Sequence, residues 1–183
     1  MTTMVCVFCG AREGYDSAYR EAAQAFGETL ARRGFGLVYG GGKVGLMGVV
    51  ADAVLAAGGR VVGVIPGFLT RAEVLHAGLS EQVLVDDLFE RKAVMIERAD
   101  AFVALPGGIG TFDELLEVIA WRQLGQLQQP IGLLNVNGFF DPWLALFNHW
   151  VERGFASAHD ITHLIVDSDG ERLADHLQRP AAT

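Results

Sequence analysis

The chain has 183 residues, of which 51% are hydrophobic, and this length suits one domain with a substantial core. Its formal net charge of -8 leaves no basic surface for a nucleic-acid backbone, so an anionic ligand would have to be small and held by a few placed groups. No apolar stretch reaches the roughly 18 residues that cross a bilayer, and no basic segment precedes the first apolar run, so we expect a soluble protein without a signal peptide.

Strand-like and helix-like segments alternate along the chain. The expected strands are short and apolar, and they cover residues 4–8, 36–40, 60–66, 82–86, 101–105, 131–136 and 164–168. The expected helices cover residues 17–33, 46–57, 87–99, 111–124, 142–153 and 169–178. Apolar strands that alternate with helices form parallel sheets covered on both faces, with right-handed crossovers. We therefore predict a single α/β domain over residues 1–183, with a doubly wound, mostly parallel sheet of about seven strands.

The two cysteines, Cys6 and Cys9, lie within and just after the first expected strand. A redox pair with this C-x-x-C spacing normally opens a helix, whereas alternate side chains of a strand face opposite ways. We expect two buried, reduced thiols and a reducing, cytoplasmic compartment.

Three glycine-rich turns follow expected strands, at residues 9–14, 40–48 and 106–111. In a doubly wound parallel sheet such turns share the carboxyl edge of the strands, where ligands bind. One glycine-rich turn is weak support for a ligand site, because glycine also serves tight turns. Three turns on one edge indicate a ligand site more strongly.

The familiar nucleotide motifs do not fit these turns. A Walker loop would need Ser or Thr after Lys43, where this chain has Val44. A dinucleotide fingerprint could start at Gly108 and Gly110, but its last position is Asp113, whose charge and bulk would face a pyrophosphate. A glycine turn at a helix N-terminus remains, and its free N–H groups and positive dipole end suit one phosphate.

The acids after the third turn allow two interpretations. Thr111 and Glu114 match a capping box, in which Glu114 only bonds the backbone N–H of Thr111, and Asp113 suits a first helical turn. On local grounds this structural role is favoured. However, a carboxylate beside a phosphate is repelled unless cations intervene or it has another role. Arg91 and Lys92 are expected on the same edge, near the start of the preceding helix, where they oppose the helix dipole.

Four segments occur in an order and at spacings that carry a family resemblance: GGGKVGLMG, ERKAVM, ALPGGIGTFDELLEV and GLLNVNGFFDPW. From about Val5 to Phe155 the chain resembles the LOG ("lonely guy") family of phosphoribohydrolases, many of which were labelled putative lysine decarboxylases. The resemblance implies a Rossmann-like homodimer with its active sites at the subunit interface. It also implies hydrolysis of the N-glycosidic bond of a nucleoside 5'-monophosphate, either a cytokinin riboside monophosphate or AMP, to free base and ribose 5-phosphate.

The resemblance also implies roles for single residues. The catalytic pair would be Arg91 and Glu114. The residues implied to bind substrate are Gly41, Gly42, Glu73, Lys92, Gly107, Gly108, Ile109, Gly110 and Thr111. Two departures from the family bear on base specificity: Leu88-Phe89 replaces a frequent Met-His, and Ala120 replaces a Thr that contacts substrate.

The implied chemistry suits these residues. Ribosyl C–N cleavage passes through an oxocarbenium-like state that a carboxylate stabilises while water attacks the anomeric carbon. Glu114 could hold the ribose hydroxyls, polarise that water, or both, and Arg91 could orient the carboxylate. The five histidines lack ligand spacing, so we expect no metal and no other cofactor.

Two other classes of protein compete with this hypothesis. A pyridoxal phosphate-dependent lysine decarboxylase would need a Schiff-base lysine, for which only Lys43 and Lys92 are available. A non-catalytic protein that binds or senses nucleotides would use the same loops and stays open as the alternative.

Overall fold

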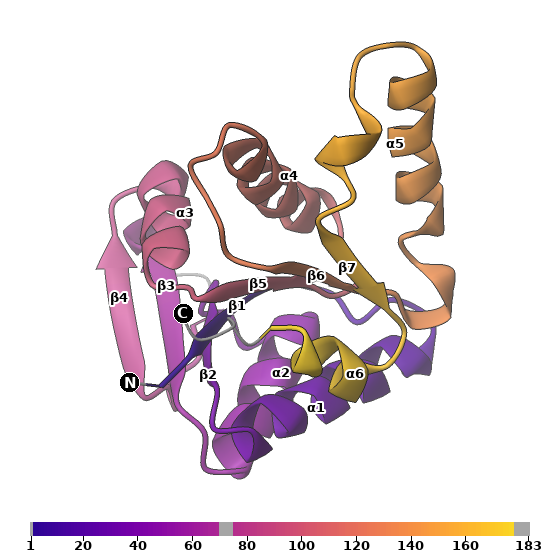
Figure 1. The fold of residues 1–183 in the computed structure, drawn as a ribbon. Coiled ribbons are helices and arrows are strands. Elements are labelled where there is room, and N and C mark those ends of the chain that lie inside the picture. The colour runs from indigo at the N-terminus through magenta and orange to yellow at the C-terminus, as the bar shows by residue number, and fades with distance from the viewer. Residues whose placement is uncertain (1, 70–74, 178–183) are drawn as a thin grey trace, which may run out of the picture.

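The computed structural model describes residues 2–69 and 75–177, and its strands form one seven-stranded parallel sheet. The spatial order of the strands is β4-β3-β2-β1-β5-β6-β7 (Figure 1). The strands are β1 Met4–Phe8, β2 Gly36–Tyr39, β3 Val61–Pro66, β4 Glu81–Val85, β5 Ala101–Ala104, β6 Ile131–Leu134 and β7 Leu164–Asp167. This confirms the predicted doubly wound α/β fold, with each strand within two residues of its expected limits.

Helices cover both faces of the sheet. They are α1 Ser17–Arg32, α2 Gly45–Ala56, α3 Leu88–Glu97, α4 Ile109–Gln123, α5 Asp141–Glu152 and α6 Gly170–Asp175. Helices α1, α2 and α6 lie on one face, and α3 and α4 lie on the other (Figure 1). The local sequence explains where several of the helices begin. For example, the Asp87 carboxylate accepts hydrogen bonds from the amides of Phe89 and Glu90, both at 2.8 Å, and so caps the N-terminus of α3. Within the two described ranges, no helix is long and apolar enough to cross a membrane.

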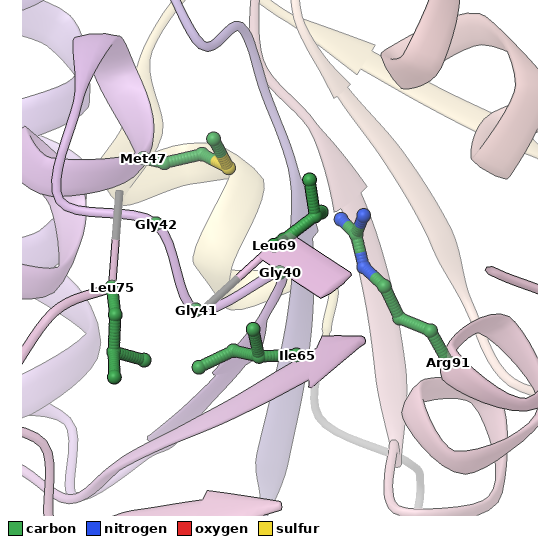
Figure 2. Close-up of a pocket in the computed structure, with 8 residues that line it drawn as sticks. All are labelled: Gly40, Gly41, Gly42, Met47, Ile65, Leu69, Leu75 and Arg91. Carbon is green, nitrogen blue, oxygen red and sulfur yellow. The ribbon is translucent and has the colours of Figure 1, made fainter. Parts of the chain in front are cut away.

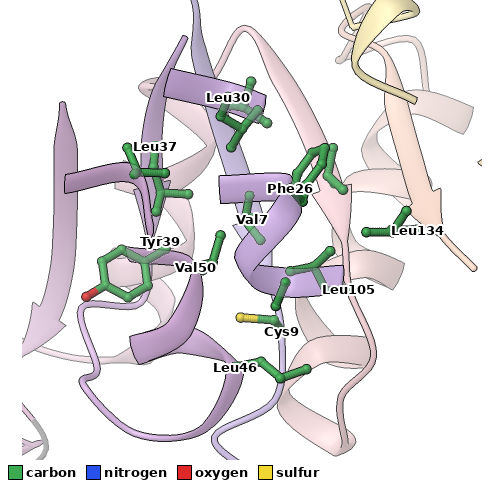
Figure 3. Close-up of a cluster of buried hydrophobic side chains, with 14 of the residues drawn as sticks. Val7, Cys9, Phe26, Leu30, Leu37, Tyr39, Leu46, Val50, Leu105 and Leu134 are labelled. Atoms are coloured by element: carbon green, nitrogen blue, oxygen red, sulfur yellow. The ribbon is translucent and has the colours of Figure 1, made fainter. Parts of the chain in front are cut away.

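Two apolar clusters fill the space between the sheet and its helices. Alternate residues of β1 point to opposite faces, so Val5 and Val7 join one cluster and Cys6 and Phe8 the other. In the first cluster the aromatic ring of Phe26 is fully buried among strand residues (Figure 3). Burying a side chain of this size contributes about 1.5–3 kcal/mol. These clusters pack the helices onto the sheet.

Both cysteines are free and buried, as predicted. Burial, with a contribution from the nearby Glu114 carboxylate, raises the pKa of Cys6 and of Cys9. Neither thiol is therefore ionised near neutral pH, and both serve as packing groups.

The strand order reverses between β1 and β5. From β1 the chain winds outward through β2, β3 and β4, and it then returns to place β5 on the other side of β1. The loops that follow β1 and β5 touch there, because the amide of Gly10 donates to the carbonyl of Pro106 at 3.1 Å. Ligands of doubly wound folds bind at such a reversal. The candidate site is built around it.

Candidate active site

The glycine turn after β5 leads directly into α4. Gly108 is the N-cap residue of this helix, and no side chain caps it. Thr111 is therefore the third helical residue, and its side chain is buried beneath Gly107: a Cβ added to Gly107 would lie 2.0 Å from Thr111 Oγ1. The first amides of α4 have no acceptor within the helix and no capping side chain. Uncapped helix amides of this kind are suited to an anion, and anion binding at this turn stays a prediction.

The capping-box interpretation of Thr111 and Glu114 is wrong. The helix starts at Ile109, two residues earlier than predicted, so Thr111 is not the N-cap residue. Glu114 lies one turn further along, and its carboxylate bonds Arg91 rather than the helix start. The physical reason is that Gly108 takes the N-cap position, so Thr111 falls inside the first helical turn, where its side chain is buried under Gly107.

Neither packing nor backbone conformation requires a glycine at positions 108 and 110. A Cβ added at either position would meet no atom within 4 Å, and neither residue has a positive φ. Both border a cavity of about 510 Å³ at the strand reversal. Their missing side chains therefore leave room in a cavity rather than relieve a clash.

This cavity, which we call the reversal cavity, is lined by both loops of the reversal. Its lining residues are Gly10, Ala11, Arg12, Glu13, Gly14, Tyr19, Leu46, Pro106, Gly107, Gly108, Ile109, Gly110 and Phe139. Four of the five residues predicted at the third glycine turn lie here, and the fifth, Thr111, packs underneath. Ile109 is 91% exposed although it is apolar.

Arg91 and Glu114 meet between α3 and α4. Arg91 Nη2 donates to Glu114 Oε1 at 2.9 Å, and the two side chains are only 16% and 11% exposed. The guanidinium also lies against the backbone at the end of β2, where a Cβ on Gly40 would be 2.1 Å from Arg91 Nη2 (Figure 2). Among the described residues, Arg91 Nε is buried and finds no hydrogen-bond acceptor. A bound ligand could supply that acceptor.

The pKa of Glu114 is raised to about 7. Burial is the main cause, the Arg91 guanidinium opposes it, and the charge of Asp113 adds to it. Near neutral pH the carboxyl group can therefore exist in both protonation states. A pKa close to the operating pH favours general acid–base catalysis.

Lys92 lies beside this pair but faces α4. Its Nζ is 2.5 Å from Glu117 Oε2 and 3.1 Å from Asp113 Oδ2. Although burial opposes the charge, the bonds to Glu117 and Asp113 raise the pKa of Lys92. The ammonium therefore offsets acidic charge around Glu114, and its direct contact with substrate stays a prediction.

The second glycine turn borders a smaller cavity of about 60 Å³ (Figure 2). Its lining residues are Gly40, Gly41, Gly42, Met47, Ile65, Leu69, Leu75 and Arg91. Gly41 has a φ of +73°, and a Cβ there would lie 2.1 Å from Ile65 Cγ1. The Tyr39 hydroxyl donates to the carbonyl of Gly42 at 3.1 Å and fixes the turn. We call this mostly apolar space the β2 cavity.

The two cavities are neighbours on the carboxyl edge. Leu46 borders the reversal cavity, and the next residue, Met47, borders the β2 cavity. Arg91 borders the β2 cavity and holds Glu114. The predicted residue Glu73 lies outside the described residues. The site thus combines an uncapped helix start, a buried Arg–Glu pair and an apolar recess.

Sequence reasoning missed Gly40 and Glu117. Gly40 is the first glycine of the G-G-G run. A side chain at this position would collide with Arg91, which is 51 positions away in the sequence. Glu117 lies one helical turn after Asp113, a spacing that could have indicated a shared cation. Of the two departures from the family, Phe89 is 79% exposed and Ala120 is also exposed.

The histidines do not assemble a metal site in the described part of the chain. His159 and His163 stack edge to face, with ring centroids 4.5 Å apart. Across residues 2–69 and 75–177, no group of three or more His, Cys, Asp or Glu side chains is placed to hold a metal ion.

Comparison with known proteins gives consistent relatives. A family model described as "possible lysine decarboxylase" matches residues 47–177. The probable cytokinin riboside 5'-monophosphate phosphoribohydrolase LOGL1 of Oryza sativa subsp. japonica is 49% identical over 90% of this chain and 73% of its own length. The cytokinin riboside 5'-monophosphate phosphoribohydrolase LOG of the same organism is 48% identical over 92% of this chain and 69% of its own length.

Solved structures share the fold. The X-ray structure of TM1055, a structural genomics target, is 28% identical, with a TM-score of 0.70 over 96% of this chain and 97% of that one. The molybdenum cofactor binding protein from Rippkaea orientalis has a TM-score of 0.73 over 96% and 95% of the two chains, at 17% identity. At that identity the second likeness concerns the fold alone.

Proposed function

The chain belongs to the LOG family of phosphoribohydrolases, and we propose that it hydrolyses the N-glycosidic bond of a nucleoside 5'-monophosphate to free base and ribose 5-phosphate. The substrate would be a cytokinin riboside 5'-monophosphate, AMP, or both. The observation that carries the proposal is the buried Arg91–Glu114 pair beside an uncapped, glycine-rich helix start.

The phosphate would bind at the glycine turn of α4. The free amides there and the positive end of the helix dipole attract an anion. Gly108 and Gly110 leave room for the anion to approach the backbone closely. This assigns a role to two glycines that neither packing nor backbone conformation requires.

The ribose would lie at the Arg91–Glu114 pair. As the C1'–N bond breaks, its electrons move to the base, which takes up a proton, and positive charge develops on the ribose. An ionised Glu114 would stabilise that charge and accept a proton from the water that attacks C1'. Arg91 would hold the carboxylate in place and limit its repulsion from the phosphate. The base would extend toward the β2 cavity, whose apolar lining suits a heterocycle.

A lysine decarboxylase, which the description of the family model names, fits these residues poorly. The Lys92 ammonium is held by Asp113 and Glu117, and Lys43 is exposed on the second glycine turn. A Schiff-base lysine needs an uncharged amine in a protected site. The curated relatives are instead named as phosphoribohydrolases.

The protein would act as a homodimer. Leu88 and Phe89 of α3 are 47% and 79% exposed close to Arg91, and Trp121 and Leu124 at the end of α4 are 44% and 73% exposed. Large exposed apolar side chains suit a face that meets a second copy. Light scattering should give the mass of a dimer at micromolar concentration; a monomer mass would refute this. The free, buried cysteines also agree with a cytoplasmic location.

A chromatographic assay tests the proposed reaction. Purified protein incubated with AMP should release adenine and ribose 5-phosphate, whereas adenosine should stay intact because it lacks the group that the helix start binds. AMP that is bound but returned intact would instead identify a non-catalytic nucleotide-binding protein. Equal cleavage of adenosine would contradict anchoring by the phosphate.

A further inference from the structure

The loop between β1 and α1 carries one arginine, Arg12. Arg12 is exposed, and no hydrogen bond or ion pair joins its guanidinium to any other described residue. It borders the reversal cavity together with Gly108 and Gly110. The next residue, Glu13, borders the same cavity, but its charge is offset by Arg20, whose Nη1 lies 2.6 Å from Glu13 Oε1.

The backbone that presents Arg12 is held firmly. Gly10 donates to Pro106 at 3.1 Å and accepts from the amide of Met47 at 3.4 Å. On the other side, Gly45 has a φ of +59°, and a Cβ there would lie 2.3 Å from the amide nitrogen of Arg12. The loop is therefore clamped between the glycine turn and the start of α2. Arg12 projects from a fixed position on the edge of the cavity.

The two cations that lie beside Glu114 are already engaged. Arg91 bonds Glu114, and Lys92 bonds Asp113 and Glu117. A nucleotide phosphate carries nearly two negative charges, whereas a helix N-terminus offers only about half a positive charge. In a chain with a net charge of -8, the full positive charge of Arg12 strongly changes the electrostatic charge at the edge of the reversal cavity.

We propose that Arg12 binds the 5'-phosphate of the substrate across the reversal cavity, opposite the glycine turn of α4, and so helps the site to select nucleotides over nucleosides. This rests on the proposed function, because it identifies a further binding residue of the same site. The planar guanidinium fork can donate two parallel hydrogen bonds to a phosphate, while the helix amides bind its other oxygens.

The test compares Arg12→Ala, Arg12→Lys and the wild type by titration calorimetry with ribose 5-phosphate. Arg153→Ala serves as the control: it removes an equal charge from an exposed position at the end of α5, away from the cavity. Loss of a charge-assisted contact should weaken binding about 10-fold in Arg12→Ala, and the lysine variant should recover part of the loss. Arg153→Ala should bind as the wild type does.

Kinetics with AMP give a second readout. Because the phosphate is remote from the bond that breaks, Arg12→Ala should raise KM about 10-fold and leave kcat nearly unchanged. Ribose 5-phosphate binding that is equal in Arg12→Ala and the wild type would overturn the proposal, as would equal weakening in Arg153→Ala. If the wild type releases no adenine yet Arg12→Ala still weakens ribose 5-phosphate binding, the hydrolase function fails and the phosphate role of Arg12 stands.

Discussion

Replacing Glu114 with Gln should separate activity from stability. The substitution keeps the shape of the side chain and leaves a carbonyl oxygen to accept the hydrogen bond that Arg91 Nη2 donates at 2.9 Å. It removes the negative charge that would stabilise the developing ribosyl cation. Loss of a comparable transition-state contact costs about 100-fold or more in kcat, which is about 3 kcal/mol. AMP should still bind, and even more tightly, because a charge near its phosphate is gone.

The same substitution should make the protein more stable at alkaline pH. In the folded protein the pKa of Glu114 is raised from 4.5 to about 7, mainly by burial. The folded state therefore binds a proton more tightly than the unfolded state, and stability falls as the pH rises from about 4.5 to 7. A difference of this size corresponds to about 3 kcal/mol. Glu114→Gln should therefore raise the free energy of unfolding by up to this amount at pH 8, where Glu114 is ionised. Near pH 4, where Glu114 is protonated, it should leave the free energy of unfolding unchanged.

Two assays check this reasoning. Adenine release from AMP measures the loss of kcat, and urea unfolding at pH 8 and at pH 5 measures the free energy of unfolding. A Gln variant that turns over at close to the parental rate would return Glu114 to a purely structural role. A variant that is less stable than the parent at pH 8 would show that burial of the ionised Glu114 carboxylate does not destabilise the folded protein.

Three further predictions follow from the same geometry. In Gly40→Ala the new Cβ would lie 2.1 Å from Arg91 Nη2, so kcat should fall at least about 10-fold while the melting temperature changes little; an unchanged kcat would exclude a positioning role for Gly40. Gly108→Ala should unfold like the parent but raise KM for AMP, whereas Gly107→Ala, which collides with Thr111 Oγ1, should lose about 1–3 kcal/mol in urea unfolding. The kcat/KM for AMP should rise with pH through about 7 as Glu114 ionises. If the Glu114→Gln variant shows the same rise, the titration belongs to another group, such as the substrate phosphate.

The sequence predicted most of the fold because its signal is local. Each apolar run that became a strand carries its own pattern, and the alternation with helices restricts the topology to a doubly wound sheet. The spatial order of the strands was not predicted, because it depends on which apolar faces pack together. The edge strands β4 and β7 are only partly buried, which separates them from the central strands.

The site was predicted less completely because its decisive contacts are distant in sequence. The T-x-x-E pattern of Thr111 and Glu114 is the same in a capping box and in this helix, and only the packing of Thr111 beneath Gly107 separates the two. The pairing of Arg91 with Glu114 spans 23 positions. A sequence signal did exist, because Arg91 opposes the dipole of its own helix, and this unfavourable placement indicated a partner elsewhere.

The position of α2 between the two cavities bears on which positional isomers the site would accept. Leu46 faces the reversal cavity and Met47 the β2 cavity, so one rigid helical turn sets the separation between the proposed phosphate and base positions. A nucleotide phosphorylated at its 2' or 3' hydroxyl carries the same charge and the same base, but at a different separation. The geometry of α2 would reject such isomers even though every single contact group is present in them.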